Sequence, residues 1–197
     1  MKSSSALVSA LALLLALIPS CSRSTGTVAT INTSAVPSPQ KQSTSTEVKS
    51  PLPTPTGFVS DYANVFDAES KARLESLMIE LKDKSAIEFA VVTVETTEGQ
   101  PIFDYSLALA RAWGIGPKDT SKGGGLLLML AVKDRQWRIQ VSRNLEKDLP
   151  DEVCKELGEQ SQALYRKGKY GDGIVKNVNL IIQRLEKLKG FKLAPKV

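Results

Sequence analysis

One stretch of the chain decides the fold: residues 113–146 read WGIGPKDTSKGGGLLLMLAVKDRQWRIQVSRNLE. It passes from a glycine-rich loop into an apolar run at residues 125–132, then through a tight turn and back to an acidic loop at Glu146. A run without polar alternation predicts a strand that is buried on both faces. Within residues 135–141 apolar and polar side chains alternate, which predicts a half-exposed strand beside it.

The residues before this stretch predict two helices and one more strand. Asp67 is expected to cap a helix that runs to about Lys84, because apolar residues recur there at helical spacing. Residues 86–94 are mainly apolar and β-branched, which predicts a strand. Pro101 suits the first turn of a second helix, which we expect to end at Gly114.

The C-terminal third predicts two amphipathic helices, at residues 150–166 and 174–188, separated by a break at residues 168–173. Asp148 or Asp151 can cap the first of them. The expected order is helix, strand, helix, strand, strand, helix, helix. This order favours an α/β fold, a three-layer α/β/α sandwich with a small mixed sheet.

The N-terminal residues predict an export signal with a lipid attachment site. Residues 1–20 join a short basic start to an apolar run of signal-peptide length, too short to span a bilayer. Cys21 follows the tripeptide Ile-Pro-Ser, an arrangement that looks like a bacterial lipobox. In that case acyl chains on Cys21 would anchor the chain in the lipid bilayer, each buried methylene contributing about 0.8 kcal/mol. The alternative is an ordinary secretory signal with an incidental cysteine.

The composition of the remaining residues indicates three segments, a linker, a folded domain and a short tail. Residues 21–56 are rich in Ser, Thr and Pro and have no apolar periodicity, which predicts a disordered linker. The folded domain is expected at residues 57–190, and residues 191–197 form a basic tail. We therefore expect an extracytoplasmic, membrane-anchored lipoprotein of a bacterial cell envelope.

The net charge of +5 comes entirely from outside the expected domain. Residues 57–190 contain 20 Lys and Arg and 20 Asp and Glu. A nucleic-acid-binding face needs cations concentrated on the folded part of a protein. The sequence therefore predicts no nucleic-acid partner.

Residue types missing from the chain exclude several kinds of chemistry. The chain has no histidine, which excludes Ser-His-Asp and Cys-His catalysis and zinc sites that contain histidine. If Cys21 carries lipid, only Cys154 remains, so no intramolecular disulfide can form. We expect Cys154 to be a buried, inert thiol rather than a nucleophile.

The glycine triplet Gly123, Gly124 and Gly125 does not fit a nucleotide-binding loop. A P-loop places its glycines after a strand and before a helix, whereas these glycines precede a strand. Two interpretations stay open: their backbone N–H groups could approach an anion or other ligand, or the loop could be a flexible connector.

Five motifs in a fixed order resemble the TPM domain family over roughly residues 57–188. They are Asp61-Tyr62-Ala63, the valine-rich strand at 90–94, Trp113-Gly114-Ile115-Gly116, the leucine strand after a glycine loop, and Leu145-Glu146 with Leu149-Pro150-Asp151. The resemblance implies an α/β/α sandwich, usually outside the cytoplasm and associated with a membrane. It also implies varied roles: acid phosphatase activity and photosystem repair in plant lumenal members, calcium binding in some members, and a receptor accessory subunit in an animal member.

The resemblance carries an acidic cleft over to Asp61, Glu146 and Asp151. Such carboxylates could hold Ca²⁺ or another divalent cation, since Ca²⁺ takes six to eight oxygen ligands. Two simpler interpretations stay open: a loop hydrogen bond for Asp61 and a helix cap for Asp151.

This chain departs from the family pattern at two places near the expected cleft. Gly123 and Gly124 stand where members often have Asp-Asn. Ser142-Arg143-Asn144 stands where members often have Gly-x-Gly, which places Arg143 beside the acidic positions. Arg143 could pair with Glu146 in place of a metal, or bind a phosphate oxygen. We therefore expect a binding or accessory module for membrane protein complexes. The alternative is a divalent-cation-dependent acid phosphatase with Asp61 and Glu146 as the metal-holding, catalytic pair.

Overall fold

A computed structural model of the chain describes residues 51–119 and 122–193. The predicted signal peptide, Cys21, the linker up to residue 50 and residues 194–197 of the tail lie outside the described residues. Among the described helices, none is both long and apolar enough to cross a membrane.

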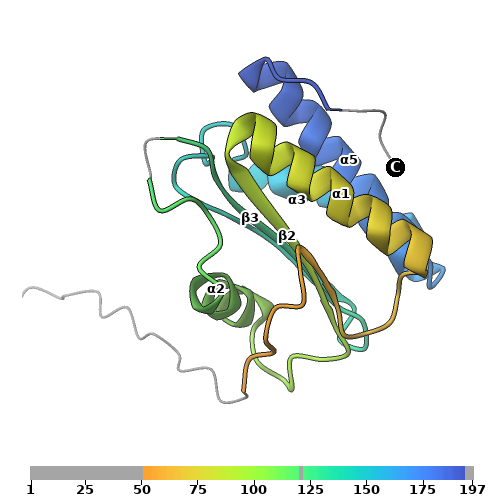
Figure 1. Ribbon diagram of the computed structural model, residues 1–197. Coiled ribbons are helices and arrows are strands. Elements are labelled where there is room, and N and C mark those ends of the chain that lie inside the picture. Colours follow the sequence, from red (N-terminus) through yellow and green to blue (C-terminus); the bar gives the residue numbers. More distant parts are fainter. Residues whose placement is uncertain (1–50, 120–121, 194–197) are drawn as a thin grey trace, which may run out of the picture. The chain divides into compact units, whose positions relative to one another are not determined.

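The described chain builds a four-stranded mixed sheet with helices on both faces (Figure 1). The strand order is β1-β2-β3-β4, with the first two pairs parallel and the last antiparallel. The elements in chain order are β1 (Val59–Asp61), α1 (Ala68–Ser85), β2 (Ile87–Val94), α2 (Ile102–Ala112), β3 (Gly124–Ala131), β4 (Gln136–Val141), α3 (Asp151–Glu159), α4 (Gln162–Arg166) and α5 (Tyr170–Lys189).

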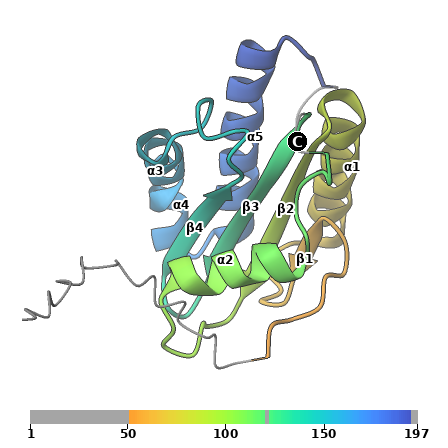
Figure 2. The ribbon, with the colours of Figure 1, turned by 90° about the vertical axis from the view of Figure 1, so that its left-hand side faces the viewer.

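The two faces of the sheet are covered unequally, as Figure 2 shows, with α2 alone in front of the strands and the other helices behind. Phe89, Leu126 and Leu128 belong to the core cluster that α1 and α5 cover. Val92 and Leu127, on the opposite face of the same strands, belong to the cluster beneath α2. The predicted three-layer α/β/α sandwich with a small mixed sheet is confirmed.

The central hairpin has the burial that its sequence pattern predicts. Every residue of β3 is buried, whereas β4 is an edge strand in which only Ile139 is fully buried. The alternation sends Ile139 to the large core, while Arg138 and Gln140 face the α2 side of the sheet. The edge strand is therefore apolar toward one layer and polar toward the other.

The first strand was not predicted from the sequence. β1 has three residues and pairs in parallel with β2, with Val59 opposite Val91 and Asp61 opposite Thr93. Three residues are too few to show an alternating pattern. The observed order therefore begins with a strand, before the first predicted helix.

The predicted helix at residues 150–166 is in fact two helices, because α3 ends at Glu159 and α4 begins at Gln162. Between them, the buried Ser161 hydroxyl donates to Asn177 Oδ1 of α5 at 2.5 Å. A serine that bonds to a neighbouring helix competes with a regular helix at this position.

The predicted break at residues 168–173 is also wrong from residue 170 onward, because α5 begins at Tyr170. Gly171 and Gly173 are helical, and both allow close packing. A Cβ at Gly171 would lie 2.6 Å from the Val65 carbonyl oxygen, and one at Gly173 would lie 2.3 Å from the Tyr165 ring.

The last residues of the predicted linker contact the folded domain. Leu52 packs against the α2 cluster, and the Trp113 indole N–H donates to the Pro53 carbonyl oxygen at 2.8 Å. The Thr56 N–H donates to the Ser60 hydroxyl oxygen at 3.0 Å. We call residues 52–56 the N-terminal strap.

Candidate functional site

Asp61 ends β1 and organises the loop that follows it. Its carboxylate accepts hydrogen bonds from the N–H groups of Val65, at 3.1 Å, and Phe66, at 3.0 Å. It also accepts one from the hydroxyl of Thr93 on the neighbouring strand. Of the two open interpretations, the structure displays the loop hydrogen bond.

Asp61 and Glu146 lie toward opposite ends of the strands. Asp61 is in register with Leu130 of β3 by way of β2. By contrast, Val141, which precedes the Glu146 loop, pairs with Leu126. The two rows are roughly 13 Å apart at about 3.3 Å per residue. The structure therefore does not bring these two predicted site residues together.

Three of the predicted residues do share one depression, which we call the α2 groove. It has a volume of about 620 Å³ and lies between α2, β4 and the segment from residue 142 to the start of α3. Its charged lining consists of three cations and three acids, namely Arg111, Arg138, Arg143, Glu146, Asp151 and Glu152. Its charge is therefore balanced, and Glu146, Asp151 and Arg143 are its sequence-predicted members.

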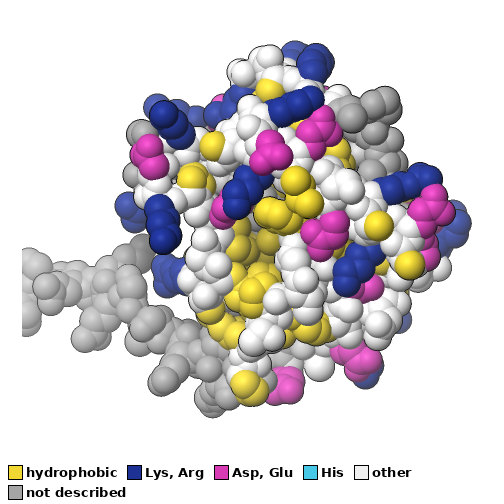
Figure 3. All heavy atoms as spheres, in the orientation of Figure 1, with side chains coloured by type: hydrophobic (Ala, Val, Ile, Leu, Met, Phe, Trp, Pro, Cys, Tyr) yellow, Lys and Arg dark blue, Asp and Glu magenta, His cyan; other side chains and the backbone are white. Residues whose placement is uncertain are grey.

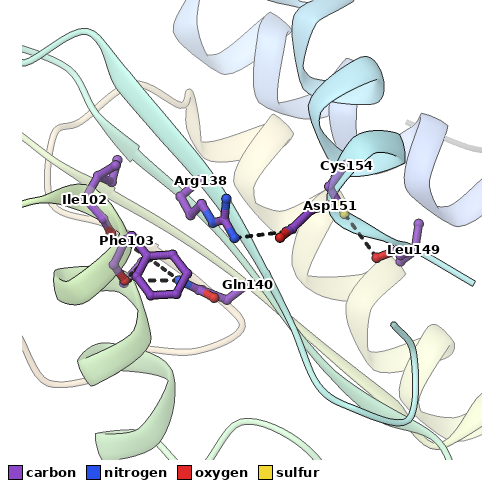
Figure 4. Close-up of polar contacts among 8 residues, drawn as sticks. Ile102, Phe103, Arg138, Gln140, Leu149, Asp151 and Cys154 are labelled. Carbon is purple, nitrogen blue, oxygen red and sulfur yellow. Dashed lines mark hydrogen bonds and ion pairs between the residues drawn. The ribbon is translucent and has the colours of Figure 1, made fainter. Parts of the chain in front are cut away.

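Arg138 joins the two walls of the α2 groove (Figure 4). Its guanidinium donates to Asp151 Oδ1 at 3.0 Å and lies 4.9 Å from the centre of the Phe103 ring. The neighbouring Gln140 amide donates to the Phe103 carbonyl oxygen at 3.1 Å and to the Ser106 hydroxyl oxygen at 2.9 Å. Strand β4 thus holds α2 on one side and the start of α3 on the other.

Asp151 is at the first position of α3, but its side chain does not cap the helix. The N-cap residue is Pro150, without a side-chain hydrogen bond, and Asp148 instead pairs with Lys189 at 2.7 Å. The helix-cap interpretation of Asp148 and Asp151 is therefore wrong. The Asp151 side chain is 74% exposed, which leaves it accessible from the groove.

Arg143 and Glu146 lie in the exposed turn that follows β4. Within the described part of the chain they form no ion pair with each other. Both charges are therefore available to a ligand in the groove. The described residues also contain no group of three or more Asp, Glu, Cys or His side chains placed to hold a metal ion.

The glycine triplet has a packing role that neither open interpretation anticipated. A Cβ at Gly123 would lie 1.8 Å from the Ala86 carbonyl oxygen, and one at Gly125 would lie 2.5 Å from that of Ile115. Gly124 and Gly125 already belong to β3, and the Gly125 N–H donates to the Ser142 hydroxyl oxygen at 2.9 Å. The triplet lets loops approach the start of the central strand.

Glu88 supports the loop before the groove, a role that the sequence pattern missed. It accepts a hydrogen bond from the Gly116 N–H at 2.8 Å and pairs with Lys82 at 2.8 Å. Partial burial acts to raise the pKa of Glu88, but the bonds from Lys82 and Gly116 prevail and lower it. The carboxylate is therefore charged and fixes the Gly116 backbone beside β3.

A separate, apolar depression of about 200 Å³ lies at the sheet edge between the two helical layers. Figure 3 shows hydrophobic side chains gathered in a hollow on this face. Phe58, Ala90, Trp113 and Ile115 contribute to its lining. It contains one acid, Glu88, which the loop already uses.

Cys154 is buried in α3, and its thiol donates to the Leu149 carbonyl oxygen at 3.5 Å. Burial, with a smaller contribution from Asp151, raises the pKa of Cys154 to about 11. A thiol that is protonated at neutral pH is a poor nucleophile. These properties support the expectation of an inert structural cysteine.

The mixed four-stranded sheet and its two unequal helical layers define a small α/β/α sandwich, with a polar groove beside the hairpin. The sequence pattern of the TPM domain matches residues 59–184. The chain belongs to the TPM domain family. No curated protein matches it.

The solved structures similar to the described domain include two with TM-scores above 0.5. The N-terminal domain of a protein from P. gingivalis shares 28% identity, with a TM-score of 0.62, and the match covers 71% of this chain and 88% of that one. The BA42 protein from the psychrophilic bacterium Bizionia argentinensis shares 17% identity, with a TM-score of 0.52, and covers 62% and 82% of the two chains. The second likeness concerns the fold alone.

Proposed function

We propose that this chain is a membrane-tethered, extracytoplasmic TPM domain that binds membrane protein complexes through the α2 groove. The observation that carries the proposal is the composition of the groove, where opposite charges balance around an exposed aromatic ring. Phe103 is 47% exposed, and Arg138 beneath it pairs with the exposed Asp151. Arginine and aromatic side chains are enriched where proteins bind one another.

The placement of Asp61 favours binding over metal-dependent hydrolysis. Its carboxylate already accepts three hydrogen bonds and lies toward the opposite end of the strands from Glu146. The groove retains Glu146 and Asp151 as nearby oxygen donors, and Asp151 is paired with Arg138. Glu152 also lines the groove, but the described residues contain no group of three such side chains placed to hold a metal ion.

The tether in this proposal is Cys21 carrying acyl chains, with residues 22–50 as the spacer. Several acyl chains together give firm anchoring in a bilayer. Replacement of the thiol in Cys21→Ser should move the protein from the membrane fraction to the soluble fraction. Mass spectrometry of the N-terminal peptide checks the modification, and an unmodified Cys21 in the membrane-bound protein would contradict it.

Site-specific photocrosslinking in the native membrane tests the binding role. A photoreactive residue in place of Phe103 should capture a discrete membrane protein. The same residue in place of Ile79, a hydrophobic side chain on α1 that is 50% exposed, should not. Adding Arg138→Gln should lower capture at position 103 at least about fivefold, because a charge-assisted contact is lost. Equal capture from both positions would refute a role for the groove.

The second candidate is phosphomonoester hydrolysis, which the three arginines of the groove favour because guanidinium groups bind phosphate oxygens. Glu146 and Asp151 would then hold the divalent cation. This candidate predicts metal-dependent turnover of a chromogenic phosphate that Glu146→Gln abolishes. Calorimetric titration with Ca²⁺, Mg²⁺ and Mn²⁺ separates the two functions, because three silent titrations would eliminate the metal-dependent enzyme and leave the binding module standing.

A further inference from the structure

A second pocket lies on the opposite face of the sheet from the α2 groove. It has a volume of about 360 Å³ and is formed where β3 ends, β4 begins and the short helix α4 passes above them. Its walls are three aromatic side chains, Trp137, Tyr165 and Tyr170. Two arginines, Arg135 and Arg166, complete its polar lining with a glutamine.

Two of the aromatic rings, those of Trp137 and Tyr165, pack directly against the backbone of neighbouring helices. A Cβ at Gly158 of α3 would lie 1.9 Å from the Trp137 ring, and one at Gly173 of α5 would lie 2.3 Å from the Tyr165 ring. Each glycine inside a helix costs about 1 kcal/mol relative to alanine. The sequence thus has its glycines where the two rings press against the helices.

Buried hydrogen bonds fix the orientation of Tyr165. Its hydroxyl oxygen accepts from the Asn177 amide at 2.8 Å, and the same amide accepts from the Ser161 hydroxyl at 2.5 Å. Ser161 and Asn177 are fully buried. Tyr170 stacks beside Tyr165, with ring centres 6.3 Å apart and planes at 24°. The pocket therefore offers ordered ring faces before any ligand enters.

The charge in this pocket is of one sign. Its lining contains two guanidinium groups and no acid. Within the described residues neither arginine forms an ion pair, although Arg166 donates to Gln162 Oε1 at 3.0 Å. Burial raises the pKa of Tyr165, so its hydroxyl carries no negative charge at neutral pH. Guanidinium groups beside flat aromatic faces suit an anion attached to a ring.

We propose that this pocket binds a small aromatic anion, a flat ring that carries a phosphate or carboxylate group, with the ring against Trp137 and Tyr165 and the anion on Arg135 and Arg166. It is a ligand site separate from the α2 groove, since the two depressions share no lining residue. The anion would receive charge-assisted hydrogen bonds from two side chains, and the ring would displace water from apolar surface.

Nuclear magnetic resonance titration of the full-length chain tests the proposal with four probes. Phenylphosphonate carries both ring and anion, methylphosphonate lacks the ring, benzyl alcohol lacks the charge, and adenosine monophosphate presents a larger ring system. Phenylphosphonate or the nucleotide should bind at least about tenfold more tightly than the two partial probes, since each of the partial probes loses one class of contact. If phenylphosphonate binds more tightly than the nucleotide, the pocket favours a ligand with a single ring. If the nucleotide binds more tightly, it favours a purine.

The two indole N–H signals supply an internal control. The signal of Trp137 should shift on binding. The signal of Trp113, whose indole N–H donates a hydrogen bond to the Pro53 carbonyl oxygen on the α2 side of the sheet, should not shift. Arg135→Gln and Arg166→Gln should each weaken binding about tenfold. Arg73→Gln removes an exposed arginine on α1 and should leave binding unchanged.

Three results would overturn the proposal. Phenylphosphonate and the nucleotide could bind no better than the partial probes, the Trp113 signal could move instead of that of Trp137, or Arg73→Gln could weaken binding as much as the pocket variants. Both pocket arginines are exposed, so their replacement leaves the core intact. An unchanged amide spectrum of each variant confirms that loss of binding is not loss of the fold.

Discussion

The two faces of the sheet differ in how much apolar surface their helices cover. The face beneath α1 and α5 is covered by a continuous apolar cluster that includes Phe89 and Leu128. The opposite face has a smaller cluster under α2, where Gln140 of the edge strand also donates hydrogen bonds to α2. Apolar packing is non-directional and extensive, whereas a few hydrogen bonds can hold a helix while leaving a groove open beside it. The difference explains why the α2 groove lies on the thinner side.

Two adjacent leucines on the central strand provide the strongest test of this difference. Leu128→Ala should destabilise the protein by roughly 4 kcal/mol and Leu127→Ala by about 2.5 kcal/mol, because a single helix can settle into the cavity more easily than a layer of several. Leu128 and Leu127 have the same chemistry and are both buried, and they differ in the face they occupy. Urea unfolding measures both. If Leu127→Ala lowered the free energy of unfolding more than Leu128→Ala, the α2 layer would be the less adaptable of the two, contrary to our prediction.

The close approach at the start of β3 can be isolated with two glycines. Gly123 and Gly168 have similar left-handed backbone angles, φ +66° and +72°. A Cβ at Gly123 would strike the Ala86 carbonyl oxygen, whereas one at Gly168 would meet nothing within 4 Å. Gly168→Ala should therefore cost about 1 kcal/mol from backbone strain alone. Gly123→Ala should cost a further 1–3 kcal/mol, roughly the usual penalty of overpacking.

Thermal melting of both glycine variants measures this difference. If the two substitutions prove equally destabilising, contact with Ala86 does not limit the start of β3. A greater loss for Gly123→Ala would show that the joint between the strand and the loop before it is tightly packed, even though the layer above it is thin.

The smallest expected effect concerns the loop that leads into α2. Asp134, in the turn between β3 and β4, accepts hydrogen bonds from the Thr97 N–H at 2.7 Å and the Thr96 hydroxyl at 2.9 Å. The bond from the Thr97 backbone, with help from both hydroxyls, lowers the pKa of Asp134 below its ordinary value of 3.8. The carboxylate therefore stabilises the folded protein above that value, and the contribution disappears as the pH falls through the lowered pKa.

Asp134→Asn should cost about 1 kcal/mol at neutral pH, a modest value because this group is partly exposed and water screens its charge. The difference in melting temperature between the native and variant proteins should then shrink as the pH falls through the lowered pKa of Asp134. A difference that stays constant from neutral to acidic pH would mean that the charge of Asp134 does not hold the α2 layer.

The sequence predicted those elements whose pattern is local. The buried β3 is an unbroken apolar run, and the first helix has both its apolar stripe and its cap, since Asp67 accepts from the Ser70 N–H at 2.7 Å. β1 escaped prediction because its three residues become a strand only by pairing with β2. The break at Ser161 depends in the same way on Asn177, a partner in a later helix.

The candidate site was predictable only in part, for the same reason. Glu146, Asp151 and Arg143 come from one short segment, and they do share the α2 groove. The distance between Asp61 and Glu146 depends on the order and direction of the strands. The residues next to Asp61 in the sequence do not encode that order. A local signal for the groove did exist: the α2-facing positions of β4, Arg138 and Gln140, are both polar although they lie beside a fully buried strand.

The N-terminal strap gives the domain a mechanical asymmetry. Any tension applied to the chain ahead of residue 51 first reaches Leu52 and the bond between Pro53 and Trp113, both on the side held by a single helix. Those contacts are few and would yield before the large core under α1 and α5 is loaded. The strap would then detach from the domain and extend, so that the chain lengthens under force while the sheet stays folded.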